Sequence, residues 1–207
     1  MQLRSTEYYY TIDRQASEEF KDRGSKFIGY AFPVGSVENF KEKLNEVKKL
    51  HPKATHHCFA YRLGLDGNTF RVSDDGEPSG SAGRPILGQI DSKELVNVLV
   101  VVVRYFGGTL LGVPGLINAY KSAAALALQT TPLVQRQVEQ ELLVQFDYTQ
   151  LNEIMRVVKQ YNGRVISQEM QLFCSMKLAV PRNRCNEINY ILKELRNVEV
   201  SLVKGGS

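Results

Sequence analysis

The stretch LVNVLVVVVRYFGG, from Leu95 to Gly108, decides the fold of the N-terminal part of the chain. The run from Leu95 to Val103 is almost entirely branched aliphatic, which is typical of a strand buried on both faces. Arg104 and two aromatic residues end this run, and a pair of glycines follows. The sequence therefore predicts a central strand whose sheet is covered on both sides.

Segments before and after this strand alternate between β-prone and helical patterns. Ser36 has the features of an N-cap, and the apolar residues after it recur at helical spacing up to His51-Pro52, which ends the helix. The tetrapeptide LDGN at residues 65–68 separates two β-prone runs and indicates a hairpin. The strands expected here are 8–12, 26–32, 57–63 and 69–72, and further helices are expected at about 82–90 and 115–129.

The C-terminal part has a simpler rhythm, which predicts the order βαββαβ of a ferredoxin-like domain. We expect Thr149 to cap its first helix, Asn162-Gly163 to end that helix, and Pro181 to open the second. The strands expected are 141–146, 165–170, 173–180 and 198–202. Because Thr130-Thr131-Pro132 resembles a linker, the sequence predicts an α+β protein with domains at residues 1–133 and 134–207.

Composition limits the class of protein. Of the 207 residues, 43% are hydrophobic and 23% are charged, as in ordinary globular proteins. No apolar run approaches the roughly 20 residues of a membrane span, so no membrane partner is expected. The first residues lack an apolar signal core, and three widely spaced cysteines form no CxxC pair. These features predict a cytoplasmic protein with reduced thiols.

The net charge of +4 does not indicate a bulk polycation. Residues 1–133 carry 16 basic and 14 acidic residues, and residues 134–207 carry 10 and 8, so each part has a net charge of +2. Dedicated nucleic-acid domains usually concentrate their basic residues on one face. A local basic patch remains compatible with this distribution.

The segment His56-His57-Cys58 has residue types that bind metals or act as nucleophiles. Neighbouring residues of a strand point to opposite faces, so His56 and His57 cannot easily share one ion or one substrate. Zinc needs three or four protein ligands, and His51 is the one other suitable side chain nearby. We therefore expect ordinary strand positions, with no metal and no cofactor.

The loop SDDGEPSGSAGRP, residues 73–85, concentrates carboxylates among glycines and prolines. Its order does not match a calcium-binding loop, and two adjacent aspartates do not provide the separate environments that an acid–base pair needs. Asp74 and Asp75 are expected to accept backbone N–H bonds and so to fix the turn. A protein partner with a basic face would suit Asp74, Asp75 and Glu77 better than RNA would.

The segment GGTLLGVPG, residues 107–115, stands between a buried strand and a helix, where α/β proteins often bind phosphates. Its glycine spacing matches neither a dinucleotide-binding fingerprint nor a P-loop. Contact between backbone amides and an anion, helped by Arg104 and Lys121, stays open. The alternative is that Gly107 and Gly108 simply allow a tight turn.

Three blocks of this chain resemble the IMPACT family: HHCFAY (56–61), SDDGEPSGSAG (73–83) and VVVRYFGGTLLGVPGL (101–116). The resemblance implies an N-terminal domain like domain 2 of ribosomal protein S5. It also implies a C-terminal domain like the ferredoxin-fold domain V of elongation factor G. Because both analogues act on ribosomes or RNA, it implies a role in translation regulation, and it supplies no catalytic residue.

The leading hypothesis is a non-catalytic, translation-associated regulator that binds the ribosome, RNA or a translation-related protein. One alternative is a protein–protein regulator without nucleic-acid contact. Another is a small hydrolase or metal-dependent enzyme that uses His56, His57, Asp74 and Asp75. The candidate binding residues are His56, His57, Asp74, Asp75, Gly76, Glu77, Pro78, Gly83, Arg84, Arg104, Tyr105, Gly107, Gly108, Gly112 and Lys121.

Overall fold

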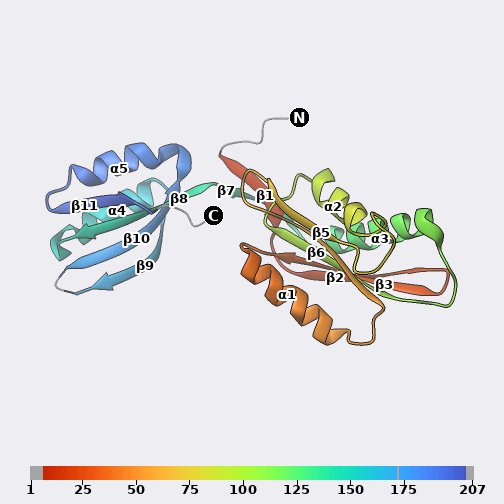
Figure 1. Ribbon diagram of the computed structural model, residues 1–207. Helices are drawn as coiled ribbons and strands as arrows, with labels where there is room; N and C mark the ends of the chain where they lie inside the picture. Colours follow the sequence, from red (N-terminus) through yellow and green to blue (C-terminus); the bar gives the residue numbers. More distant parts are fainter. Residues whose placement is uncertain (1–6, 172, 204–207) are drawn as a thin grey trace. The chain divides into compact units, whose positions relative to one another are not determined.

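The structure is a computed structural model that describes residues 7–171 and 173–203 (Figure 1). It divides into two compact units, one of residues Tyr9–Arg136 and one that begins at Gln137 and includes Glu7 and Tyr8. The strand β7 (Leu133–Gln137) pairs with β1 (Tyr8–Ile12) and spans the boundary expected after residue 133. Among the described residues, no helix is long and apolar enough to cross a membrane.

The first unit contains a five-stranded antiparallel sheet with the order β2-β3-β6-β4-β5. Its middle strand β6 (Val98–Tyr105) comes from the apolar run at residues 95–103, so the predicted central strand is confirmed. The hairpin at residues 65–68 is confirmed as well, because the strands on either side of it pair antiparallel. The other strands are β2 (Ala16–Asp22), β3 (Ser25–Pro33), β4 (His56–Leu63) and β5 (Thr69–Ser73).

Helices cover both faces of this sheet, which explains the unbroken apolar run of β6. Val98, Val100 and Val102 join the core beneath α2 (Gly83–Ser92) and α3 (Gly112–Gln129). The alternate residues Leu99, Val101 and Val103 join a second core with side chains of α1 (Val37–Leu50). A strand with apolar neighbours on both faces has no position at which a polar side chain reaches water.

The helix α3 approaches the sheet closely because both surfaces are small. A Cβ atom at Gly29 would lie 2.4 Å from the carbonyl oxygen of Ala123 and 3.1 Å from the Cβ atom of Ala127. The buried face of the helix includes four alanines, so its backbone can rest on β3. This close packing holds the C-terminal half of α3 against β3.

Three elements of the first unit differ from the prediction, and one of them is β7, which was not expected after the linker-like residues 130–132. The edge strand β2 was missed, because its sequence ASEEFKD alternates half-buried and exposed residues and is rich in charge. Such polar strands are common at sheet edges. The helix α3 begins at Gly112 and not near Gly115. Pro114 is tolerated there because an N–H in the first helical turn has no partner within the helix.

The second unit confirms the predicted ferredoxin-like order βαββαβ. Its sheet has the order β11-β8-β10-β9 with antiparallel pairs, and its buried residues form one core shared with both helices. The elements are β8 (Glu139–Phe146), α4 (Leu151–Gln160), β9 (Arg164–Met170), β10 (Cys174–Pro181), α5 (Cys185–Lys193) and β11 (Val198–Leu202).

The helix ends of the second unit show where local signals were sufficient. Asn162 adopts a positive φ of 54° after α4, so the predicted stop is confirmed. The predicted cap at Thr149 is wrong, because a short 3₁₀ turn at Tyr148–Gln150 precedes the helix and its N-cap is Gln150. Pro181 ends β10, and a second 3₁₀ turn (Arg182–Arg184) stands between it and α5.

Candidate functional site

Asp74 fixes the loop that connects β5 to α2. Its Oδ1 accepts hydrogen bonds from the backbone N–H groups of Ala82 (3.0 Å) and Gly83 (2.8 Å), and its Oδ2 accepts one from Gly80 (2.9 Å). Partial burial by itself would raise the pKa of Asp74, but these three bonds outweigh it and lower the pKa. The ionised carboxylate thus caps α2, whose own N-cap residue Ala82 has no polar side chain.

Asp75 joins the same loop to β4. Its Oδ2 accepts a hydrogen bond of 2.7 Å from the backbone N–H of His57, and its carbonyl oxygen lies 2.7 Å from Nδ1 of His56. Because a carbonyl only accepts, this Nδ1 is the donor. The residue holds a positive φ of 43°, a conformation that aspartate tolerates better than most residues. The predicted turn-fixing role of Asp74 and Asp75 is therefore confirmed.

Glu77 turns inward and joins three elements. Its Oε1 accepts hydrogen bonds of 2.7 Å from Nη1 of Arg104 and 2.7 Å from the hydroxyl of Tyr120, and it lies 3.7 Å from Nε2 of His56. The side chains of Glu77 and Arg104 are only 4% and 6% exposed. This ion pair ties the loop to the end of β6 and to α3, so Glu77 is not available to a basic partner.

Aromatic rings and a buried thiol surround this pair. The guanidinium of Arg104 lies 5.5 Å from the ring centre of Phe27 and 5.6 Å from that of Phe106. The Sγ atom of Cys58 donates a hydrogen bond of 3.0 Å to the carbonyl of Asp74. Burial raises the pKa of Cys58 and that of Tyr120, so both groups stay protonated at neutral pH.

A second polar cluster lies on the opposite face of β4. Both ring nitrogens of His51 form hydrogen bonds. Nε2 lies 2.6 Å from the hydroxyl of Tyr30, and Nδ1 lies 2.8 Å from the hydroxyl of Tyr105. Nε2 of His57 lies 3.1 Å from the carbonyl of His51. Burial lowers the pKa of both histidines. The rings of His56 and His57 thus lie on different faces of β4, as the strand geometry predicted, although each approaches an atom of Asp75: its carbonyl oxygen at 2.7 Å from His56 and its Oδ2 at 3.8 Å from His57.

The glycines after β6 have distinct roles. Gly107 packs on the turn between β2 and β3, where an added Cβ atom would lie 1.9 Å from the carbonyl carbon of Gly24. Gly108 and Gly112 adopt φ values of 84° and 69°, and little surrounds either of them. The expected positive φ is thus confirmed for Gly108, whereas Gly107 is needed for the close approach to Gly24. On either side of these glycines, four large apolar side chains are exposed: Phe106, Leu110, Val113 and Ile117.

The structure brings together one group of the predicted residues and leaves others apart. Hydrogen bonds and ion pairs connect His56, His57, Asp74, Asp75, Glu77, Arg104 and Gly83. Gly76 and Pro78 are exposed within the loop. Arg84 and Lys121 are also exposed, and neither forms an ion pair within residues 7–171 and 173–203. Over the same ranges, no group of three or more metal-binding side chains occurs.

Sequence reasoning missed Tyr120 as a partner of the loop. The signal was a tyrosine among the small residues of the buried face of α3, since a buried hydroxyl nearly always has a hydrogen-bond partner. It also missed Ser25, whose Oγ accepts a bond of 3.2 Å from the N–H of Gly107 and lies 3.4 Å from Nη2 of Arg104. Nothing in the sequence near Ser25 indicates this contact.

A protein-family model and several known proteins match this chain. The Impact N-terminal domain family matches residues 23–128, a range that contains the loop, β6 and α3 up to Leu128. A protein of Escherichia coli (strain K12) named IMPACT family member YigZ is 34% identical over 188 residues, which cover 90% of this chain and 91% of that protein.

The chain belongs to the IMPACT family.

Two further comparisons show how far the likeness extends. A solved structure described as that of a hypothetical protein covers 98% of this chain at 29% identity, with a TM-score of 0.75 over 100% of that chain. A Rattus norvegicus protein named Protein IMPACT is 37% identical over 95 residues, which are 44% of this chain and 30% of that protein. The prediction of family membership is thus confirmed.

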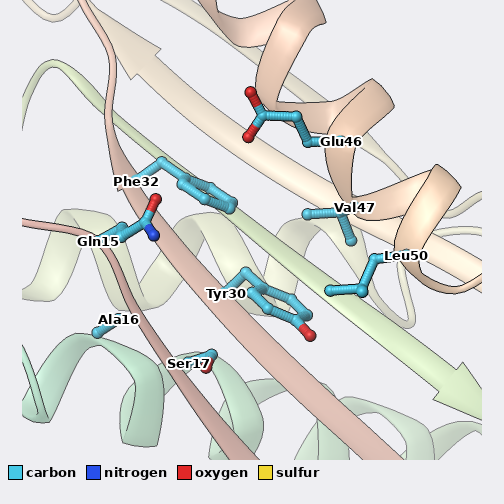
Figure 2. A pocket seen from close by; sticks show the side chains of 8 residues that line it. All are labelled: Gln15, Ala16, Ser17, Tyr30, Phe32, Glu46, Val47 and Leu50. Atoms are coloured by element: carbon cyan, nitrogen blue, oxygen red, sulfur yellow. The ribbon is translucent and has the colours of Figure 1, made fainter.

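A separate cavity of about 300 Å³ lies between the start of β2, the strand β3 and the end of α1 (Figure 2). Tyr30 and Phe32 contribute nearly parallel rings, with centres 6.1 Å apart and planes inclined by 7°. Gln15 and Glu46 contribute polar groups to its wall. None of the residues predicted for the site lines this cavity.

Proposed function

We propose that this IMPACT family member is a non-catalytic, translation-associated regulator. It binds the ribosome, RNA or a translation factor through the surface formed by the loop 73–83 and the segment that begins at Arg104. The observation that supports this proposal best is the internal use of the loop's three carboxylates, which makes the loop a rigid scaffold for its exposed residues.

The hydrogen bonds of the loop favour a binding surface over a hydrolytic site. A catalytic carboxylate has to exchange a proton or a bond with substrate, whereas Asp74 is held by three backbone N–H groups. Glu77 is held by Arg104 and Tyr120. A loop fixed in this way loses little conformational entropy when a partner binds to it.

The exposed residues next to this scaffold have the chemistry of a docking surface. Gly76 and Pro78 present backbone, and Arg84 and Lys121 present positive charge without an ion-pair partner in the described part of the chain. Cations of this kind attract phosphates or carboxylates. The assignment to translation rests on family membership and on the translation-component domains that the family resemblance implies.

Co-sedimentation of the full chain with purified ribosomes at several salt concentrations tests this proposal. We expect binding at low salt that weakens as salt rises, with a shallower salt dependence in the double variant Arg84→Glu/Lys121→Glu. Lys49→Glu is the matched control, because Lys49 is an exposed lysine of α1 outside the site. If the wild-type chain stays in the supernatant at every salt concentration, the proposal is wrong.

A second candidate function is regulation of a protein partner without nucleic-acid contact. The exposed apolar side chains between Phe106 and Ile117 favour it, because such side chains are common in protein interfaces. Sedimentation after nuclease treatment separates the two candidates. Binding that survives digestion of RNA points to a protein contact.

A further inference from the structure

The segment from Phe106 to Ile117 exposes an unusual amount of apolar surface. Leu110 is 82% exposed, Phe106 48%, Val113 46% and Ile117 37%. We call these four side chains the 106–117 ridge. Large apolar residues scattered singly over a surface need no explanation, whereas four within one short segment indicate a binding site.

The ridge continues along one side of α3. Val113, Ile117 and Lys121 follow one another at intervals of four residues, so they lie on the same face of the helix. The adjacent face of the helix, which includes Leu116 and Tyr120, is buried against the sheet, so the row lies at the border of the buried face. Lys121 is the single charged residue in the sequence of this helix. A second helix can therefore pack along a row of two aliphatic side chains that ends in a cation.

The start of the ridge is fixed before any partner arrives. The backbone N–H of Gly107 donates to Ser25, and that of Phe106 lies 3.4 Å from Oγ1 of Thr55. The ring of Phe106 rests over the guanidinium of Arg104, which is itself held by Glu77. Little additional order has to be imposed on binding, which favours affinity.

The segment that carries the ridge has no acidic residue of its own and has two cations near it, while Glu18 and Asp22 of β2 alternate with Phe20, which packs on the core beneath α3. The sequence has no aspartate or glutamate from Arg104 to Lys121, and the acidic side chains of the neighbouring loop bind internal donors. Lys121 lies at one end, and Arg23 is exposed beside Gly24, against which Gly107 packs. Within the described ranges, neither Arg23 nor Lys121 has an ion-pair partner.

We propose that the 106–117 ridge, with Arg23 and Lys121, binds an amphipathic helix of a partner protein whose apolar face is flanked by aspartate or glutamate. The apolar side chains of such a helix cover the ridge, and its carboxylates pair with the two cations. This inference rests on the proposed function and specifies the class of partner for that site.

The composition of the ridge favours protein over RNA. Binding to nucleic acid depends on several cations for phosphates and on open aromatic faces for bases. Here three of the four exposed side chains are aliphatic, and the ring of Phe106 already contacts Arg104. Aliphatic side chains provide burial energy for a protein contact but offer no stacking surface to a base.

A pair of labelled peptides tests the inference with the full chain. Each has about 20 residues, long enough for a stable helix, with leucine along one face and flanking residues that are glutamate in one peptide and lysine in the other. Fluorescence anisotropy should show that the glutamate peptide binds more tightly. Leu110→Asp should weaken that binding about tenfold or more, as at an interface hot spot.

Charge reversal and a matched control make the test specific. Lys121→Glu should weaken binding of the glutamate peptide and strengthen binding of the lysine peptide, because it reverses the charge at one end of the ridge. Leu50→Asp should leave both affinities unchanged, because Leu50 is 65% exposed on α1, on the other side of the sheet. Circular dichroism of each variant confirms that it is folded.

Three outcomes would overturn the inference. These are equal affinity for the two peptides, no binding of either peptide, and an equal loss in the Leu50→Asp control. Loss of binding to single-stranded RNA or to anionic vesicles in Leu110→Asp, with the peptide affinity unchanged, would assign the ridge to those partners instead.

Ribosome co-sedimentation of Leu110→Asp separates this inference from the proposed function. If the wild-type chain and the variant sediment equally, the proposed function stands and the ridge is not its docking surface. If neither sediments but the wild type binds the glutamate peptide, the ridge inference stands and the translation assignment fails.

Discussion

The loop 73–83 and the 106–117 ridge are neighbours that differ in where their side chains point. The carboxylates of the loop bind groups of their own domain, whereas the apolar side chains of the ridge face the solvent. The loop is acidic in sequence, but Asp74, Asp75 and Glu77 all bind donors of the same domain. The ridge is apolar in sequence, but its large side chains are exposed. The difference shows that charge in a sequence is not charge on a surface. Polar residues that are surrounded by donors hold a scaffold together, while unpartnered apolar residues mark the surface where a partner binds.

The largest expected effect comes from separating the buried pair of the loop. Glu77→Ala leaves the Arg104 guanidinium buried without its counter-ion, so we expect a loss of about 3–5 kcal/mol in the free energy of unfolding. Urea denaturation followed by circular dichroism measures it. The double variant Glu77→Leu/Arg104→Met, which removes both charges, should lose less free energy of unfolding than Glu77→Ala does.

Glu19→Ala is the matched control for that experiment, because Glu19 pairs with Lys21 and Lys26 at the surface. We expect little change, since exposed pairs contribute little to stability. Equal losses in Glu77→Ala and Glu19→Ala would contradict the structural role assigned to the buried pair.

The next largest effect is expected at Gly107, where the segment of the ridge packs on the turn between β2 and β3. In Gly107→Ala the new methyl group would lie 2.1 Å from the carbonyl oxygen of Gly24, so the turn between β2 and β3 has to move. We expect a loss of about 1–3 kcal/mol, as for other overpacked sites. Gly88→Ala in α2 is the control, because nothing lies within 4 Å of its new Cβ atom. It should gain up to about 1 kcal/mol in helix propensity, and a stable Gly107→Ala would disprove the close approach.

A smaller effect concerns the cap of α2. Asp74→Ala removes the acceptor for Gly80, Ala82 and Gly83 and should cost about 1–2 kcal/mol. Asp74→Asn keeps one acceptor oxygen and should lose less. Because the pKa of Asp74 in the folded chain lies below its ordinary 3.8, the carboxylate stabilises the fold above about pH 3.8.

This contribution disappears as the pH falls below 3.8 and through the folded value. Thermal unfolding measured between neutral and acid pH should show wild type and Asp74→Ala converging in acid. Curves that stay parallel over that range would show that the carboxylate does not act as a charged cap.

The histidines on the opposite face provide a weaker, pH-dependent effect. Burial lowers the pKa of His51 and of His57 below 6.5, so the unfolded chain binds more protons than the folded chain just below that pH. Stability should therefore fall as the pH falls through 6.5 and recover above it.

In His57→Gln the melting temperature should change less steeply with pH just below 6.5 than it does in the wild type. Above that pH the two plots of melting temperature against pH should run parallel. An unchanged slope would remove His57 from this effect.

The smallest effect on stability is expected at the ridge itself. Leu110→Ser should change the free energy of unfolding by no more than about 0.5 kcal/mol, because Leu110 is 82% exposed and has little packing to lose. The same change should weaken binding of the glutamate peptide. A large loss of stability would mean that Leu110 packs within its own chain and is not free for a partner.

The sequence by itself determined most of the helices and strands, the central position of β6 and the ferredoxin-like domain. These follow from local patterns: an apolar run for a strand buried on both faces, helical spacing after Ser36, and a hairpin signal at residues 65–68. The polar edge strand β2 was not predicted, because its stability comes from the neighbouring strand β3 and not from its own composition.

Only the tertiary structure decided which candidate residues act together. Glu77 lies 27 residues from Arg104 and 43 from Tyr120 along the chain, so no local pattern indicates that the three share one buried oxygen. In the same way, only the structure shows that the large side chains of the 106–117 ridge are exposed. A residue's type limits what it can bind, but long-range packing decides whether it faces a donor of its own chain or the solvent.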